Sequence, residues 1–173
     1  MRTQDAIAEF ILLSKPGTAR YLVGFEDANH TRQAPHLPNH VAWNLGHLAL
    51  TMHRACEKVD GAGPPESDFI LGSARADAAR FGAESVAFGS TPSADSHAYP
   101  PLARCVEIYH GAIDRTAAVA RALPDSRLTE VVTWGPMQSP LFLLLMRMGF
   151  HNGMHVGQIA DLRRALGFKS IFA

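Results

Sequence analysis

The chain has 173 residues, of which 47% are hydrophobic and 18% are charged, so it is long enough to bury a substantial core. Sixteen Lys and Arg residues balance sixteen Asp and Glu residues, and the pI is about 7.1. A neutral chain without a basic run has little electrostatic attraction to nucleic acid or to an anionic membrane surface. We therefore expect one domain, residues 1–173, that binds neither.

The first two predicted helices lie in the N-terminal third of the chain. Apolar residues at helical spacing predict a helix over 3–27, and Pro16-Gly17 inside it predicts either a kink or a break into two shorter helices. After a loop, Pro38 opens a second predicted helix that ends near Val59.

A long connection follows the second helix. More than half of residues 61–100 are Gly, Ala, Ser or Pro, and at most one short helix, over 73–81, is expected there. The segment has too few large apolar residues for a core of its own, but it is long enough to run back along the second helix. Pro100-Pro101 then opens a third predicted helix, which ends near Leu123.

The last predicted helix covers 139–167, after a turn-rich loop over 125–138. Pro140 falls in its first turn, and Gly167 stands where a helix commonly ends. We find no convincing strand, internal repeat or phosphate-binding loop. Four helices with apolar stripes therefore predict an all-α fold, a four-helix bundle with a long crossover connection between helices 2 and 3.

Two histidines interrupt the apolar stripe of the last helix. His151 and His155 are four residues apart, so their side chains lie one turn above the other. Imidazoles on an apolar face need polar partners, and one divalent metal ion bound to both would supply them. The alternative is a pair of ordinary hydrogen-bonded core histidines. Because Asn152 follows His151, the motif is not HExxH and brings no adjacent general base.

Four further histidines lie on the other predicted helices. His47 borders the apolar stripe of the second helix, near enough to reach the interior, whereas His40 and His53 are expected at the solvated surface. His110 borders the core face of the third helix. It is a candidate fourth ligand or a donor to a ligand, with an ordinary hydrogen-bonded helix histidine as the alternative.

Two segments, WNLGHLA at 43–49 and HNGMHVGQIADLRRALG at 151–167, together resemble the DinB/YfiT-like superfamily of metalloenzymes. Helix order, length and the long connection extend this resemblance over nearly the whole chain. The resemblance implies a three-histidine metal site formed by His47, His151 and His155. Three neutral imidazoles with an open coordination position suit Zn²⁺ best, and also Ni²⁺ or Fe²⁺.

Polar residues near these histidines are candidates for orienting a ligand or binding a substrate. Asn44 lies one turn before His47, and Gln158 lies three residues after His155. Ordinary interhelical hydrogen bonds are the alternative role for both. Arg163 and Arg164 are candidates for binding a substrate carboxylate, although arginines in the last turn also suit the helix dipole. No Asp or Glu is placed as a general base, so the catalytic residues are unassigned.

The resemblance implies a metal-dependent enzyme, either a hydrolase or a transferase. The transferase would join a low-molecular-weight thiol, such as bacillithiol or mycothiol, to a small electrophilic substrate, with the metal lowering the pKa of the thiol. The alternative is a stress-linked, non-catalytic metal-binding module that dimerises. A cleft that opens on the metal would favour the enzyme. DNA binding is opposed by the neutral charge.

The expected cellular and oligomeric context follows from simpler features. Cys56 and Cys105 form no CxxC motif, so buried free thiols in a reducing cytoplasm are expected, with a disulfide as the alternative. The N-terminal residues lack the pattern of a secretory signal, and the longest apolar run, 140–146, is too short to span a bilayer. These features predict a cytoplasmic protein with no membrane partner. The broad apolar stripes of the helices predict a homodimer.

Overall fold

The computed structural model describes residues 1–172 and is mainly helical, with two small strand pairs. The helices are α1 (Thr3–Leu12), α2 (Ser14–Leu22), α3 (Val41–Asp60), α4 (Leu102–Ala122) and α5 (Leu141–Ala165). The strands are β1 (Phe69–Ile70), β2 (Phe81–Gly82), β3 (Val131–Trp134) and β4 (Met137–Pro140). Short 3₁₀ helices cover Ala83–Ser85, Ser96–Ala98 and Asp125–Arg127. The mainly helical class is confirmed, and the expectation of no strand is wrong.

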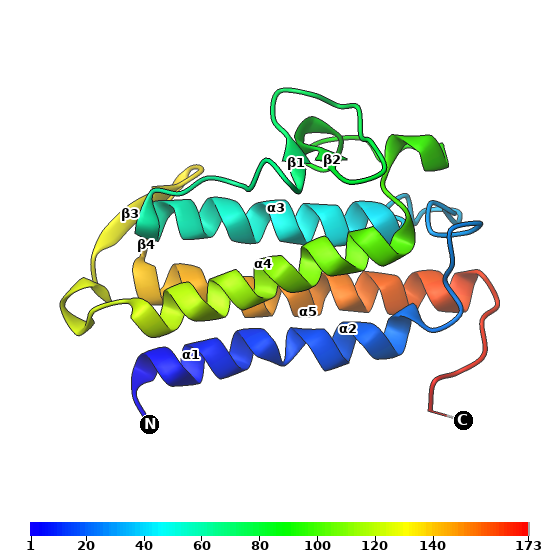
Figure 1. Ribbon diagram of the computed structural model, residues 1–173. Coiled ribbons are helices and arrows are strands. Elements are labelled where there is room, and N and C mark those ends of the chain that lie inside the picture. Colours follow the sequence, from blue (N-terminus) through cyan, green and yellow to red (C-terminus); the bar gives the residue numbers. More distant parts are fainter. Residues whose placement is uncertain (173) are drawn as a thin grey trace.

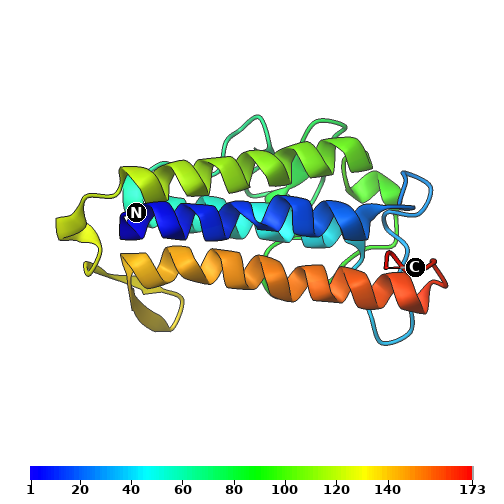
Figure 2. The ribbon, with the colours of Figure 1, turned by 90° about the horizontal axis from the view of Figure 1, so that it is seen from below.

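The helices lie alongside one another over most of their length (Figures 1 and 2). α3 packs against α4 and α5, α1 packs against α4 and α5, and α2 packs against α5. Their buried faces supply one core, with Leu45 and Leu48 from α3, Ile113 from α4 and Leu144 and Met148 from α5. None of the described helices is both long enough and apolar enough to cross a membrane.

The first helical segment is broken into two, and the break falls at Leu13 rather than at Pro16-Gly17. Pro16 occupies the first turn of α2, where its missing N–H removes no helical hydrogen bond. Leu13 keeps helical backbone angles, so α2 continues α1 nearly in line (Figure 1). The alternative of two shorter helices is therefore the one observed.

The connection between α3 and α4 runs back along α3 to the end where α4 begins (Figure 1). The short helix expected over 73–81 is absent from it. Gly72, just before this segment, has a φ of 68°, and Arg104 of α4 donates to the carbonyl of Ala79. β1 and β2 pair in parallel here, with Phe69 opposite Phe81. Both phenylalanines are buried, so the connection adds to the main core.

The loop predicted over 125–138 contains the β3–β4 hairpin. Trp134 pairs with Met137 across Gly135-Pro136, and the φ of 58° at Gly135 is the left-handed value that glycine favours at the first position of such a turn. β4 ends at Pro140, whose extended backbone delays the start of the last helix to Leu141. The hairpin brings Trp134 beside α3 and α5, where it lines a pocket.

Gly46 allows the connection to approach α3 closely, one residue before His47. A Cβ at this position would lie 2.7 Å from the Phe81 ring and 2.8 Å from the Val86 side chain. Only a residue without a side chain fits at these distances. Gly46 therefore lets the segment around Val86 lie directly against α3, next to His47.

Candidate metal centre

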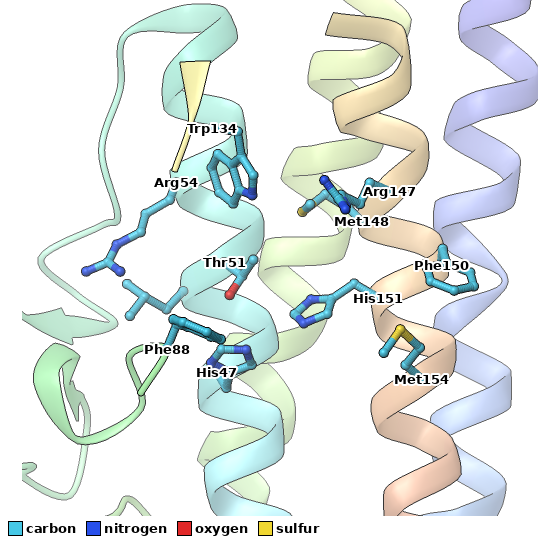
Figure 3. A pocket seen from close by; sticks show the side chains of 11 residues that line it. His47, Thr51, Arg54, Phe88, Trp134, Arg147, Met148, Phe150, His151 and Met154 are labelled. Atoms are coloured by element: carbon cyan, nitrogen blue, oxygen red, sulfur yellow. The ribbon is translucent and has the colours of Figure 1, made fainter. Parts of the chain in front are cut away.

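Three histidines from two helices converge on one point. His47 of α3 and His151 and His155 of α5 each offer one ligand nitrogen, and these atoms all lie within 4.8 Å of one another. The Nε2 atoms of His151 and His155 are 3.1 Å apart. Figure 3 shows His47 and His151 facing one another across the space between α3 and α5. Residues about a hundred positions apart in the sequence thus form one cluster.

His47 is held in a single tautomer by a backbone carbonyl. Its Nδ1 lies 2.9 Å from the carbonyl oxygen of Val86. A carbonyl oxygen only accepts, so Nδ1 carries the hydrogen and donates it, and the lone pair is left on Nε2. The Trp43 ring, one turn earlier on α3, stacks on the imidazole at 4.6 Å and 6° between the ring planes. Ring orientation and tautomer are therefore both fixed.

His155 is held in the same tautomer by Asn44. Its Nδ1 is 2.6 Å from Asn44 Oδ1. The Asn44 amide nitrogen donates to the carbonyls of Asn39 and His40, at 3.0 Å each, which leaves only the amide oxygen to face the imidazole. Nδ1 of His155 must then donate, and its Nε2 lone pair faces His151. Histidines that bind metals typically have such a partner on the other ring nitrogen.

All three imidazoles are neutral at pH 7, which is the state that binds a metal. Burial, with smaller contributions from the neighbouring imidazoles of His151 and His47, lowers the pKa of His155 to about 3. Burial likewise lowers the pKa of His151 to about 4. It also lowers the pKa of His47, with a smaller contribution from the charge of Arg54. No proton has to be displaced from the cluster before a cation binds near neutral pH.

The donor set fits a divalent transition metal. Nitrogen ligands of a tetrahedral Zn²⁺ lie about 2.0–2.1 Å from the ion, which places them about 3.4 Å from one another. The 3.1 Å between Nε2 of His151 and Nε2 of His155 is close to that value. The widest ligand-atom separation, at most 4.8 Å, requires a small movement of one ring. Three neutral nitrogens suit Zn²⁺, Ni²⁺ or Fe²⁺ better than Ca²⁺ or Mg²⁺, which prefer oxygen.

A pocket of about 330 Å³ opens onto two of the three histidines, His47 and His151. It lies between α3 and α5, and Trp134 of the hairpin and Phe88 of the connection complete its walls (Figure 3). Its other lining residues are Leu50, Thr51, Arg54, Arg147, Met148, Phe150 and Met154. A small molecule in this pocket would therefore reach the histidine cluster directly.

Comparison with known protein families agrees with this arrangement. The family model of the DinB superfamily matches residues 17–159, which is most of the chain and includes all three histidines. The chain belongs to the DinB superfamily. No curated protein and no solved structure matches it. Membership of the DinB superfamily and the three-histidine cluster are both compatible with metal binding.

The other predicted polar residues of this DinB-superfamily chain have different positions. Asn44 contacts His155 directly, as described above. Gln158 accepts a hydrogen bond of 3.1 Å from Asn39 in the loop before α3, and its side chain also raises the pKa of His155 slightly through a hydrogen bond. His110 lies on α4 outside the cluster, between the charges of Lys15 and Asp114. Arg163 donates to the backbone carbonyls of Tyr21 and Val23, so it fixes the end of α2 rather than facing the pocket.

His40 and His53 are buried, so the prediction that both lie at the surface is wrong. His40 caps α3, with its Nδ1 accepting from the backbone N–H of Trp43, and its Nε2 lies 2.9 Å from the carbonyl oxygen of Ser93. His53 lies 3.0 Å from the Arg115 guanidinium and packs edge-on against Phe69. The connection covers both residues, and helical periodicity alone contains no information about such a cover.

Replacing Asn44 by leucine is expected to lower the affinity for Zn²⁺ by about 10- to 100-fold, because His155 loses the acceptor that fixes its tautomer and orientation. Asn152→Leu is the matched control, since Asn152 is equally buried but donates to Ser14 and Met52. Competition with a chelating dye would measure both affinities in folded samples. Equal affinities in the two variants would contradict the role of Asn44.

Proposed function

We propose that this DinB-superfamily protein is a metal-dependent enzyme that uses His47, His151 and His155 to bind a divalent ion, with Zn²⁺ as the preferred metal. One observation carries the proposal: the pocket of about 330 Å³ opens onto His47 and His151. A purely structural metal site is closed by protein ligands, whereas a catalytic site keeps a position open. We propose the same cytoplasmic four-helix bundle with a long crossover connection as the framework of this site.

The residues of the chain would hold the ion and orient its ligands, and the ion would supply the positive charge of the site. A bound divalent metal lowers the pKa of a water or a thiol in its open position. Val86 and Asn44 keep the Nε2 lone pairs of His47 and His155 directed at the ion. Trp43 stacks on His47, and Trp134 lines the pocket. Both rings limit the access of bulk water to the cluster.

Among the described residues that line the pocket, none is an Asp or a Glu. Hydrolysis by a metalloenzyme commonly uses a carboxylate to accept a proton from the attacking water. A thiol whose pKa the metal lowers gives up its proton to solvent and needs no such base. The sulfur then forms a bond to an electrophilic carbon, and the leaving group departs with the electron pair of the broken bond. The lining therefore favours the thiol transferase over the hydrolase.

The test is whether a thiol occupies the open position. When protein loaded with Co²⁺ is titrated with 2-mercaptoethanol near pH 7, we expect a new near-ultraviolet absorption from thiolate bound to cobalt. It should saturate at one thiol per cobalt ion. Trp134→Ala widens the pocket without removing a ligand and should keep the band. A spectrum unchanged by the thiol, with Co²⁺ still bound, would contradict the transferase.

A second property, homodimerisation, is proposed from an exposed apolar patch. The patch consists of Phe10, Met137, Leu143, Met146 and Phe150, which line a hollow of about 580 Å³ beside the pocket. Phe150 is 62% exposed and Leu143 is 48% exposed, which is unusual for large apolar residues gathered in one place. A second copy of the chain would bury this surface.

A charge in the middle of this patch should separate the dimer. Met146→Glu is expected to convert the dimer to a monomer in light-scattering measurements, because burying the new carboxylate is costly. Ala118→Glu places the same charge at an exposed position of α4 and is expected to leave the mass unchanged. A monomeric wild type at micromolar concentration would contradict the proposal, as would a dimer that Met146→Glu does not affect.

A further inference from the structure

Phe88, in the connection between α3 and α4, has a side chain that is 93% exposed. Among the large apolar residues of the described chain, only Met1 at its start is more exposed. A single exposed apolar residue needs no explanation by itself. Phe88, however, also lines the pocket that opens onto His47 and His151. Its ring therefore lies at the rim of the candidate metal centre, with most of its surface still in contact with water.

The segment that carries Phe88 is anchored on α3 on both sides of this residue. Two positions before it, the carbonyl oxygen of Val86 accepts from Nδ1 of His47 at 2.9 Å. Two positions after it, the hydroxyl of Ser90 accepts from Nε1 of Trp43 at 2.9 Å. His47 and Trp43 are one turn apart on the same helix, so both anchors have a fixed spacing. The backbone of Phe88 is thus held beside a proposed metal ligand.

Between these anchors the chain forms a tight turn with Phe88 at its tip. The backbone N–H of Ser90 donates to the carbonyl of Ala87 at 3.1 Å, and Gly89 has a φ of 84°. These are the features of a type II turn with Phe88 as its second residue and glycine as its third. Because the turn is anchored while the Phe88 side chain is almost fully exposed, the ring can rotate toward a molecule in the pocket without movement of the main chain.

Other apolar residues form the base of the pocket and its opposite side. Leu50 and Met148 are each 1% exposed, whereas Phe150 and Met154 of α5 are 62% and 51% exposed. Figure 3 shows Phe88 on the α3 side of the pocket and Phe150 and Met154 on the α5 side. A cavity of about 150 Å³ is large enough to bind benzene. The pocket of about 330 Å³ therefore has room for one aromatic ring with a short substituent.

We propose that Phe88 determines the specificity of this pocket, because its ring packs onto the aromatic body of a small molecule whose polar end reaches the metal. Binding removes water from a ring that is exposed in the free protein, and the contact between two aromatic rings adds to the gain from buried area. The inference rests on the proposed function of the same pocket. It adds the class of the substrate, a small molecule with one aromatic ring.

The test compares benzohydroxamate with acetohydroxamate on Zn²⁺-loaded protein by calorimetry. Both probes carry the same metal-binding group and differ only in the body attached to it. We expect benzohydroxamate to bind at least about tenfold more tightly. Phe88→Ala should reduce this preference by about fivefold and leave the affinity for acetohydroxamate unchanged. Phe88→Tyr keeps the aromatic ring and should keep the preference.

The matched control is Leu71→Ala, which removes another exposed apolar side chain of the same connection, outside the pocket, and should keep the preference. An undiminished preference in Phe88→Ala would overturn the inference. Equal weakening of both probes would also overturn it, because Phe88 would then support the metal site and not the aromatic body. Zn²⁺ content is measured first. Zn²⁺-loaded wild type without a preference contradicts this inference alone, whereas wild type that binds no Zn²⁺ contradicts the proposed function as well.

Discussion

Replacing His155 by alanine is expected to lower the affinity for Zn²⁺ by at least about 100-fold. Loss of a residue that only orients a metal ligand already lowers metal affinity by about 10- to 100-fold. Loss of His155 should lower it more, because His155 supplies a ligand atom itself. It also lies at the centre of the cluster, with Nε2 3.1 Å from that of His151 and Nδ1 bound to Asn44. Metal content after equilibrium dialysis at a fixed free Zn²⁺ concentration would measure the effect.

The matched control is His110→Ala. His110 is also a helix histidine, half-buried, but it lies on α4 outside the cluster. Its replacement should leave Zn²⁺ binding unchanged, and circular dichroism would establish that both variants are folded. An equal loss of Zn²⁺ in the two variants would mean that Zn²⁺ binding depends on the stability of the fold and that His155 is not a ligand.

A pH-dependent loss of stability is expected from His40. Burial lowers its pKa from the ordinary 6.5 to about 4, while the ring caps α3 and lies 2.9 Å from the carbonyl oxygen of Ser93. Between these pH values the unfolded chain binds a proton that the folded chain does not. The stability contributed by neutral His40 is therefore complete above pH 6.5 and falls as the pH drops toward 4, by about 3 kcal/mol.

Urea unfolding of wild type and His40→Asn between pH 7.5 and 4.5 would measure this contribution. Asparagine keeps a capping acceptor for α3 but does not titrate. Other buried histidines, including His53 and the cluster, also reduce the stability of metal-free wild type at low pH, and they do so equally in the variant. The free energy of unfolding should therefore fall less steeply in His40→Asn. Parallel pH profiles of the two proteins would contradict the assignment.

The sequence predicted the helical part of the fold well because long amphipathic segments have a clear period. Leu45, Ile113 and Leu144 belong to the apolar stripes of the sequence, and all three are buried. α4 and α5 begin within a few residues of the predicted positions. The strands were missed for physical reasons. β1 and β2 are two residues each and depend on the packing of Phe69 against Phe81, which no local pattern shows.

The β3–β4 hairpin has a local signal in the sequence. Val131, Val132 and Thr133 form a β-branched run directly before Trp134 and Gly135, which is a typical hairpin pattern. The start of α3 was displaced for a different reason. His40 is an unusual capping residue, and its side chain depends on the carbonyl of Ser93 in the connection. A contact between residues so far apart in the sequence cannot be predicted from the pattern of one helix.

Of the candidate site, the i,i+4 spacing predicted that His151 and His155 are neighbours, and only the family resemblance added His47. Asn44 was named because of its spacing from His47, but its observed contact is with His155 on the other helix. Arg54, Phe88 and Trp134 were not predicted as site residues. They meet at the pocket because the hairpin and the connection fold over α3 and α5, which is a property of the tertiary arrangement.

The position of a bound Zn²⁺ ion tests the proposed three-histidine site most directly. An anomalous difference map from a crystal of Zn²⁺-loaded protein, collected on both sides of the zinc absorption edge, would locate it. We predict a single strong peak about 2.0–2.1 Å from Nε2 of His47, His151 and His155, with its remaining side facing the pocket. A peak bound elsewhere, or no peak among these three nitrogens in protein soaked with excess Zn²⁺, would contradict it.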